Sequence, residues 1–264
     1  MKKVLTVAGS DPSGGAGIQA DLKTIEAHGV YGMSVITALT AQNTLGVTGK
    51  FPIPAEFVAA QLKSVFEDIV PDAVKIGMLP DAEIMGAVRD TLISMGQKNV
   101  VLDPVLSSTS GTKLSAEDSR EYLKRELFPL CALITPNIPE AQILTGMTID
   151  SKKDMEKTAK LLGDTYGCGV LIKGGHSVFS GDCAEDCLYC ESSFTWYSAK
   201  RLDNPNTHGT GCTLSSAIAC NLAKGLDLGT AVSEAKGYLT KCIEYGLNIG
   251  NGRGPLEHRV KHKV

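Results

Sequence analysis

The sequence predicts an α/β protein with a mostly parallel central sheet that is covered by helices on both faces. Short apolar runs, rich in β-branched residues and bounded by Gly, Pro, Asp or Asn, alternate with amphipathic stretches almost from end to end. Such runs are typical of strands buried on both faces, and this alternation is typical of a doubly wound sheet. With 43% hydrophobic and 21% charged residues among 264, the chain can bury a sizeable core.

Six of the apolar runs are expected to form the strands of this sheet. In chain order they are Val4–Ala8, Ser34–Leu39, Ala73–Ile76, Asn99–Leu102, Ala132–Ile134 and Gly169–Ile172. Two further β-like pieces interrupt the alternation and are expected to form flaps or an antiparallel edge, namely Gly49–Ile53 and Leu188–Ala199.

The stretches between the strands have helical periodicity. In the first of them, Ile18, Leu22 and Ile25 fall on one stripe of a helix. The predicted helices are Ile18–Ala27, Ala55–Ile69, Ala82–Ser94, Ala116–Glu126, Lys152–Tyr166, Thr213–Lys224 and Thr230–Tyr245. Because no linker, repeat or low-complexity block separates these elements, residues 1–264 are expected to form one domain.

Charge and hydropathy exclude several classes of protein. The formal net charge of −3 lacks the basic excess that is typical of nucleic-acid binding. No apolar run approaches the roughly 18 residues of a membrane helix. Two lysines follow Met1, but glycines and a charged residue come too soon afterwards for a signal peptide. We therefore expect a cytoplasmic protein with no nucleic-acid or membrane partner.

The eight cysteines are expected to be reduced thiols, several of them in the core, as at Cys131, Cys168 and Cys220. Cys183, Cys187 and Cys190 have a spacing that also occurs at iron–sulfur clusters, and zinc is conceivable. No fourth Cys or His lies close by, so a structural role is favoured over a metal site.

Polar and glycine residues follow each of the six predicted strands. Ligands of open α/β sheets bind at the carboxyl ends of the strands, so these residues are expected to line one rim. They are Gly9-Ser10-Asp11, Ala41-Gln42-Asn43, Gly77-Met78, Asp103-Pro104, Thr135-Pro136-Asn137 and Lys173-Gly174-Gly175-His176.

Two glycine-rich stretches differ in what they indicate. The stretch from Gly9 to Gly17 lacks both the dinucleotide fingerprint and the Lys-Ser/Thr ending of a P-loop, so it is a weak signal. The stretch Thr207-His208-Gly209-Thr210-Gly211-Cys212-Thr213 opens a predicted helix. Exposed N–H groups and the positive end of the helix dipole favour an anion there, such as a phosphate. The same field is expected to lower the pKa of Cys212.

Two carboxylates are candidates for holding a metal ion. Asp103 and Glu140 lie on neighbouring rim loops if their strands are adjacent, and oxygen ligands together with phosphates are how magnesium is usually held. Each could equally be a helix cap or a turn residue. Asp21 lies beside the apolar stripe of the first helix, but Glu26 flanks that stripe equally well.

Taken together, these motifs closely resemble a known family over nearly the whole chain. They are similar to those of the hydroxymethylpyrimidine/phosphomethylpyrimidine kinases of thiamine biosynthesis, in the ribokinase-like superfamily. The resemblance rests on Ala8–Asp11, Gly14–Lys23, Thr37–Thr44, Lys75–Leu79, Asp103–Val105, Thr135–Asn137, Pro139–Ala141, Lys173–His176 and Thr207–Thr213.

The resemblance implies a ribokinase-like fold and roles for individual residues. Gly9, Asp21, Gln42 and Met78 would hold the pyrimidine, whose donors and acceptors suit a carboxylate and an amide. Asp103 and Glu140 would lie near Mg²⁺. ATP, the co-substrate, would contact Asn137, Lys173, Thr207 and Lys236, although Lys236 could equally be an exposed surface lysine. Gly209, Thr210 and Gly211 would form the anion hole, with Cys212 as the catalytic base.

The implied reaction is ATP- and Mg²⁺-dependent phosphorylation of 4-amino-5-hydroxymethyl-2-methylpyrimidine to the monophosphate and then to the diphosphate. Cys212 stands where most of the superfamily has an aspartate base, and it is expected to accept the hydroxymethyl proton. The loop from Asp103 to Gly111 is expected to be a mobile flap, and a homodimer is expected.

Two alternatives remain open. A pyridoxine or pyridoxal kinase of vitamin B6 salvage would share the Cys212 anion hole, and Gln42 is the residue that discriminates the two. A degenerate protein that only binds pyrimidine or nucleotide would have no need to keep Asp103, Glu140, Lys173 and Cys212 together.

Overall fold

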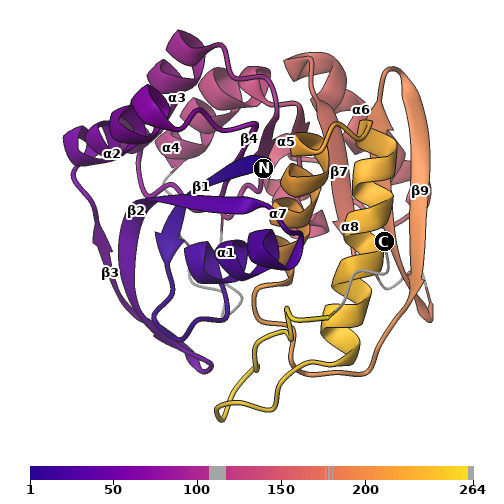
Figure 1. Cartoon of the computed structure of the whole chain (residues 1–264). Coiled ribbons are helices and arrows are strands. Elements are labelled where there is room, and N and C mark those ends of the chain that lie inside the picture. The colour runs from indigo at the N-terminus through magenta and orange to yellow at the C-terminus, as the bar shows by residue number, and fades with distance from the viewer. Residues whose placement is uncertain (107–116, 176, 178, 180, 261–264) are drawn as a thin grey trace.

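The described residues build one mixed sheet, which confirms the predicted fold class. A computed structural model describes residues 1–106, 117–175, 177, 179 and 181–260. Nine strands lie in the order β3-β2-β1-β4-β5-β6-β7-β8-β9 (Figure 1). The pairings from β2 through β7 are parallel, whereas β3, β8 and β9 join antiparallel at the two ends.

Each of the six predicted strands overlaps an observed one, although two of the predictions begin one residue too early, at Asn99 and Ala132. The observed strands are β1 (Lys3–Ser10), β2 (Tyr31–Asn43), β4 (Ala73–Ile76), β5 (Val100–Leu102), β6 (Leu133–Ile134) and β7 (Gly169–Gly174). The predicted antiparallel pieces are β3 (Gly46–Pro52) and a hairpin of β8 (Cys183–Cys190) and β9 (Ser193–Lys200). The hairpin was predicted as one piece. It turns at Glu191 and Ser192, whose φ values of 49° and 62° match the right-handed twist of the two strands.

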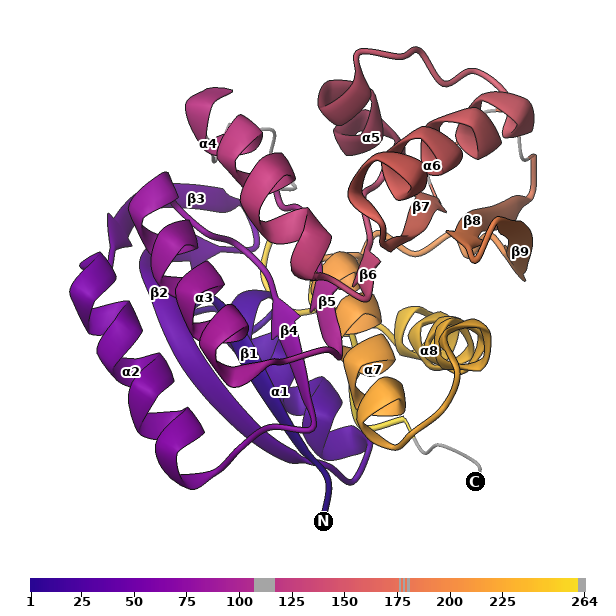
Figure 2. The same cartoon turned by 90° about the horizontal axis from the view of Figure 1, so that it is seen from above.

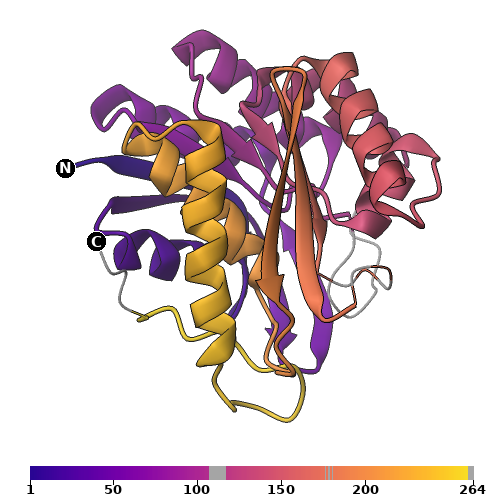
Figure 3. The same ribbon diagram turned by 90° about the vertical axis from the view of Figure 1, so that its right-hand side faces the viewer.

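Helices cover both faces of the sheet (Figure 2). One face carries α1 (Gly17–Ala27), α7 (Thr210–Ala223) and α8 (Leu228–Glu244), which runs beside the β8–β9 hairpin (Figure 3). The other face carries α2 (Ala55–Asp68), α3 (Ala82–Met95), α4 (Glu117–Tyr122), α5 (Ile138–Thr145) and α6 (Lys152–Tyr166). Among the described residues, no helix is long and apolar enough to cross a membrane.

Alternation along the strands fills two separate cores. Val101 of β5 packs under α7 and α8, whereas Val100 and Leu102 pack on the opposite side. Successive side chains of a strand point to opposite faces, so a strand covered on both sides must be apolar throughout. This is why the strands could be recognised as continuous apolar runs.

Three helical predictions differ from the structure. Helix α7 begins at Thr210, not Thr213, so the glycines belong to its first turn. Within the predicted helix Ala116–Glu126, α4 gives way to a wider π-turn at Leu123–Leu127. Helix α5 was missed because it is short, and it begins with a capping box between Asn137 and Glu140.

The segment after α8 returns to the start of α7. His258 is buried, and its Nε2 lies 3.0 Å from Thr213 Oγ1. The Tyr238 hydroxyl donates to the His258 carbonyl at 2.8 Å. Burial, with the nearby charge of Lys23, lowers the pKa of His258 to about 4.

This buried imidazole predicts a loss of stability in acid. The unfolded chain binds a proton at His258 below about pH 6.5, whereas the folded state resists protonation down to about pH 4. The stabilisation is therefore complete above pH 6.5 and is lost as the pH falls toward 4. Urea unfolding of the wild type and of His258→Gln should show wild type losing up to roughly 3 kcal/mol relative to the variant across this window. Parallel pH curves for the two proteins would contradict this account.

Candidate active site

A cavity of about 700 Å³ opens at the carboxyl ends of the parallel strands. The predicted rim is confirmed, because each of the six strand ends supplies at least one lining residue; His176 lies outside the described residues. Of the predicted site residues, all but Asp21 line this cavity. They are Gly9, Gln42, Met78, Asp103, Asn137, Glu140, Lys173, Thr207, Gly209, Thr210, Gly211, Cys212 and Lys236.

The first turn of α7 faces the cavity. Its N-cap, Gly209, has a φ of +85°, and a β-carbon there would overlap the Gly15 carbonyl oxygen. The two glycine-rich stretches therefore meet backbone to backbone, which only glycine permits at this position. A β-carbon on Gly211 would lie 2.9 Å from Asp103 Oδ2 and 3.3 Å from Lys173 Nζ. The first turn of α7 thus lies directly against an ion pair.

Cys212 lies in this first turn, and the prediction of a lowered thiol pKa is wrong. The side chain is half-buried in the wall of the cavity, and the backbone N–H of Gly17 hydrogen-bonds to its sulfur. Burial raises the pKa of Cys212 to about 11, although Lys75 acts in the opposite direction. Desolvation of the thiolate outweighs the attraction of Lys75, so the resting state is the neutral thiol.

Asp103 and Lys173 form a buried ion pair, with 2.5 Å between Oδ1 and Nζ. Asp103 follows β5 and Lys173 lies near the end of β7, and the Thr135 hydroxyl donates to the same Asp103 oxygen at 3.1 Å. Burial disfavours the Lys173 ammonium, but Asp103 and Glu140 raise its pKa above the usual value. The Lys173 side chain is therefore a fixed cation within the cavity.

Glu140 lies beside this pair and closes the capping box of α5. Its carboxylate accepts the Asn137 N–H at 2.8 Å, and the Asn137 side chain accepts the Glu140 N–H at 2.8 Å. Burial raises the pKa of Glu140 to about 7; Lys173 opposes this effect and Asp103 adds to it. Two close carboxylates in a desolvated site favour the binding of a cation beside them.

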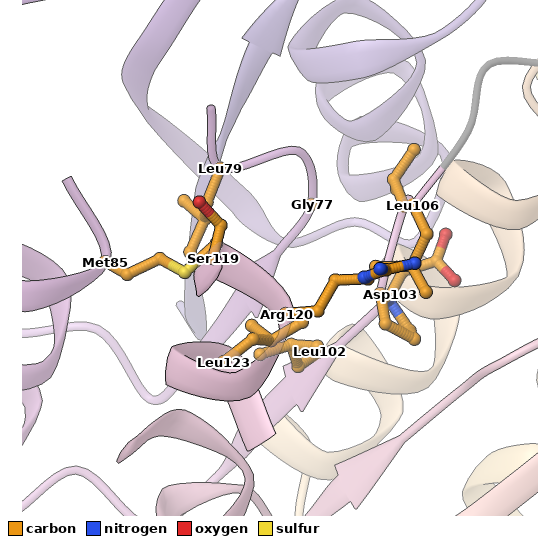
Figure 4. A pocket seen from close by; sticks show the side chains of 11 residues that line it. Gly77, Leu79, Met85, Leu102, Asp103, Leu106, Ser119, Arg120 and Leu123 are labelled. Atoms are coloured by element: carbon orange, nitrogen blue, oxygen red, sulfur yellow. The ribbon is translucent and has the colours of Figure 1, made fainter. Parts of the chain in front are cut away.

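A second, smaller cavity of about 10 Å³ lies behind Asp103. Figure 4 shows Arg120 of α4 extending across it toward Asp103, with Leu106 on the same side. The predicted flap from Asp103 to Gly111 passes here, but residues 107–111 lie outside the described residues.

Asp21 does not line the cavity, so the structure does not support direct contact between it and a pyrimidine. Its side chain is wholly buried, and both oxygens contact Lys75 Nζ, at 2.8 and 2.9 Å. Thr6 and Ser216 donate their hydroxyls to the same carboxylate. Burial disfavours the Lys75 ammonium, yet Asp21, with Cys212 and Asp103, raises its pKa above the usual value. Asp21 thus holds Lys75, which lines the cavity floor.

Lys236 is not an exposed surface lysine, so that alternative is wrong. It is 9% exposed, lines the cavity and pairs with Asp186 of β8 at 2.6 Å. The other Asp186 oxygen accepts the Gly174 N–H at 2.9 Å. This contact ties Lys236 to the end of β7, next to Lys173.

Sequence reasoning missed the network around Asp11 and His208. Both side chains are buried and line the cavity, and His208 Nε2 lies 2.9 Å from Asp11 Oδ2. Gln42 Nε2 lies 3.3 Å from the same ring nitrogen. Both residues belong to motifs recognised in the sequence, but only the fold brings positions 11, 42 and 208 together. No group of three or more Cys, His, Asp or Glu suited to a metal occurs among the described residues, the stretch Cys183–Cys190 included.

Comparison with known proteins decides the family. The family model described as phosphomethylpyrimidine kinase matches residues 11–257. The chain belongs to the phosphomethylpyrimidine kinase family. It is therefore a phosphotransferase, and the ribokinase-like fold expected from the motifs is confirmed by its structural neighbours.

Curated relatives match over nearly the full chain. A hydroxymethylpyrimidine/phosphomethylpyrimidine kinase of Haemophilus influenzae is 45% identical over 98% of this chain and 97% of its own length. A kinase of the same name from Rhizobium meliloti is 48% identical over 96% of each chain. The chain spans 52% of a thiamine biosynthesis bifunctional protein of Geobacter sulfurreducens, at 48% identity.

The solved structures that resemble this chain include a phosphomethylpyrimidine kinase and a pyridoxal kinase. The phosphomethylpyrimidine kinase of Clostridium difficile superposes with a TM-score of 0.81 at 44% identity, covering 92% of this chain and all of its own. The Bacillus subtilis pyridoxal kinase in its ADP complex superposes with a TM-score of 0.89 at 37% identity, covering 98% and 97%.

Proposed function

We propose that this enzyme transfers the γ-phosphoryl group of ATP to 4-amino-5-hydroxymethyl-2-methylpyrimidine, and then phosphorylates the monophosphate to the diphosphate. One observation carries the proposal: Gly211, in the first turn of α7, lies against the Asp103–Lys173 pair within one cavity. Helix N–H groups and a fixed ammonium are the groups that stabilise charge on a transferring phosphoryl group. The names of the relatives support the choice of substrate.

The pyrimidine would lie at the Gly9, Gln42 and Met78 end of the cavity. A β-carbon on Gly9 would overlap the Met78 side chain, so glycine lets Met78 pack against the loop after β1. Gln42 offers an amide beside this apolar wall, and an amide can match both the donor and the acceptor of an aminopyrimidine. Asp21 would act only through Lys75.

ATP would lie toward Asn137, Lys173, Thr207 and Lys236. Structural neighbours among the pyridoxal kinases hold ADP or AMP-PCP, which supports a nucleoside triphosphate as co-substrate. Lys173 would neutralise phosphate charge, and Gly209, Thr210 and Gly211 would donate N–H groups to the phosphoryl in flight.

Asp103 and Glu140 fit Mg²⁺. Their carboxylates share the buried end of the cavity, and the raised pKa of Glu140 reflects burial and negative charge that a divalent ion would offset. Magnesium typically takes one or two carboxylates, phosphate oxygens and waters. When bound, it would neutralise charge on the ATP phosphates. Lys173 orients Asp103 for this role through their ion pair.

Cys212 would accept the proton of the substrate hydroxymethyl group, which makes turnover depend on pH. Only the thiolate accepts a proton, and with a pKa of about 11 roughly one thiol in 10⁴ is ionised at pH 7. We expect kcat to rise nearly tenfold per pH unit between pH 7 and 9 with both substrates saturating. Cys212→Ala should lose this slope and about 10²- to 10⁴-fold in kcat. Full turnover by the variant would remove Cys212 from this role.

The assay that tests the proposed function compares three acceptors. We expect ATP consumption with hydroxymethylpyrimidine and with its monophosphate, and at least tenfold less with pyridoxine at matched concentration. A preference for pyridoxine would replace this function by vitamin B6 salvage, which the structural neighbours make the second candidate. If ATP were consumed with none of the three acceptors in the presence of Mg²⁺, the result would indicate a binding protein.

A homodimer would form through the β2–β3 end of the sheet. Leu39 and Phe51 are cross-strand partners at this edge, and they are 45% and 63% exposed. Leu45 in the turn between the strands is also exposed. Exposed apolar side chains gathered at a sheet edge are typical of an interaction surface. Light scattering of Phe51→Glu against wild type tests this assembly.

A further inference from the structure

The amide of Gln42 contacts two groups that together determine its orientation. One end of the amide lies 3.1 Å from Thr40 Oγ1 and the other lies 3.3 Å from His208 Nε2. The two ends have the same shape, so hydrogen bonding decides which is oxygen and which is nitrogen. The orientation matters because Gln42 faces the substrate cavity.

Asp11 fixes the proton on His208. Its carboxylate accepts N–H groups from Ser13, Gly15 and Ala16 and also the Ser13 hydroxyl. Burial opposes ionisation, but the hydrogen bonds from His208 and Ser13 lower the pKa of Asp11 below its usual value. An ionised carboxylate only accepts hydrogen bonds, so His208 Nε2, 2.9 Å away, must carry the hydrogen.

With its proton on Nε2, His208 cannot accept a hydrogen bond from Gln42. An NH₂ group turned to His208 would place two donors face to face at 3.3 Å. Rotating the amide by half a turn removes the conflict, because its oxygen then accepts a share of the Nε2–H, whose main acceptor is Asp11 Oδ2. The Thr40 hydroxyl donates to the Ser10 carbonyl at 2.9 Å, which leaves its lone pairs free to accept from the Gln42 NH₂.

The His208 ring is held too firmly to adapt in the opposite direction. A β-carbon on Gly15 would overlap ring atom Cδ2, so the ring packs flat on the loop after β1. The backbone N–H of His208 donates to the Gly254 carbonyl at 3.2 Å. The imidazole is 5% exposed.

We propose that His208, positioned by Asp11, determines substrate specificity by fixing the Gln42 amide with its oxygen toward His208 and its NH₂ toward Thr40. The Gln42 oxygen keeps a second lone pair and its NH₂ keeps a second N–H. These two groups present the substrate with an acceptor on the His208 side and a donor on the Thr40 side. An aminopyrimidine offers an amino donor next to a ring-nitrogen acceptor, and a hydroxypyridine such as pyridoxine does not. This inference rests on the proposed function, and it makes His208 a positioning residue.

The test measures kcat/KM for hydroxymethylpyrimidine and for pyridoxine in wild type and two His208 variants. His208→Phe keeps a flat ring but removes the N–H, and should lower the pyrimidine-to-pyridoxine ratio about tenfold, mainly through the KM of the pyrimidine. The KM for ATP should stay within a factor of about two, because His208 lies at the ring end. His208→Gln keeps an N–H near the Nε2 position and should restore most of the ratio.

A double variant separates positioning from damage to the fold. If His208 acts through Gln42, then His208→Phe should not change the ratio further when Gln42 is already methionine. An unchanged ratio in His208→Phe, or equal losses in both backgrounds, would overturn the inference even if the wild type phosphorylates the pyrimidine. A wild type inactive on the pyrimidine would instead overturn the proposed function. If His208→Phe does not fold, His208→Gln and Gln42→Met are each assayed alone. A pyrimidine-to-pyridoxine ratio that is unchanged in Gln42→Met would also overturn the inference.

Discussion

Replacing Lys173 with methionine is expected to lower kcat by about 10²- to 10³-fold with ATP and substrate saturating. The ammonium is a fixed cation that pairs with Asp103 beside Gly211, where charge would develop on the phosphoryl group in the proposed reaction. Methionine keeps the length and apolar stem of the side chain but removes the charge. Initial rates at several ATP concentrations separate this loss in kcat from a weaker affinity for the nucleotide.

Lys152 provides the matched control for this substitution. It is also a lysine in an ion pair, with Glu185 at 2.7 Å, but its side chain is 52% exposed and lies outside the cavity lining. Lys152→Met should leave kcat within a factor of about two. If Lys173→Met behaved like Lys152→Met, the Asp103–Lys173 pair would have no part in phosphoryl transfer.

Replacing Asp21 with asparagine is expected to destabilise the fold by about 3–5 kcal/mol. Lys75 is wholly buried, and Asp21 supplies both of its carboxylate contacts. Without that carboxylate the ammonium is either left uncompensated in a desolvated site or loses its proton, and both are costly. Urea unfolding followed by circular dichroism measures the difference.

Two further variants test whether the loss of stability comes from the uncompensated ammonium of Lys75. Adding Lys75→Met to Asp21→Asn should recover part of the stability, because the uncompensated ammonium is gone. Asp72→Asn breaks the surface pair with Lys2 and should cost at most about 1 kcal/mol. If the double variant were as unstable as the sum of the two single ones, the ion-pair explanation would be wrong.

Elements that depend on local pattern could be predicted from the sequence. β4 and α6 have the predicted bounds, Ala73–Ile76 and Lys152–Tyr166, because an apolar run and a strong 3.6-residue period identify each of them. The strand ends could be predicted to line one rim because ligands of open α/β sheets bind at the carboxyl ends of the strands, whatever the side chains there. Thirteen of the fourteen site residues that the family resemblance implied line the cavity, and six of them belong to these strand ends.

Properties that depend on burial could not be predicted. Asp21 has the sequence context of an exposed helical carboxylate, and only its contact with Lys75, 54 residues away, shows that its charge is internal. From the sequence, the helix dipole was expected to lower the pKa of the Cys212 thiol, but in the fold desolvation raises it. His208 was missed because its partners Asp11 and Gln42 lie more than 160 residues away.

The contact between Gly15 and Gly209 has a consequence for synthesis on the ribosome. Strands β1 to β7 can pair as they emerge, since each lies within the first 174 residues. The turn proposed to bind phosphate requires α7, and the backbone of Gly209 must close onto that of Gly15. A nascent chain can therefore form a nearly complete sheet and still be inactive as an enzyme. Activity should appear abruptly, once the last quarter of the polypeptide has left the exit tunnel.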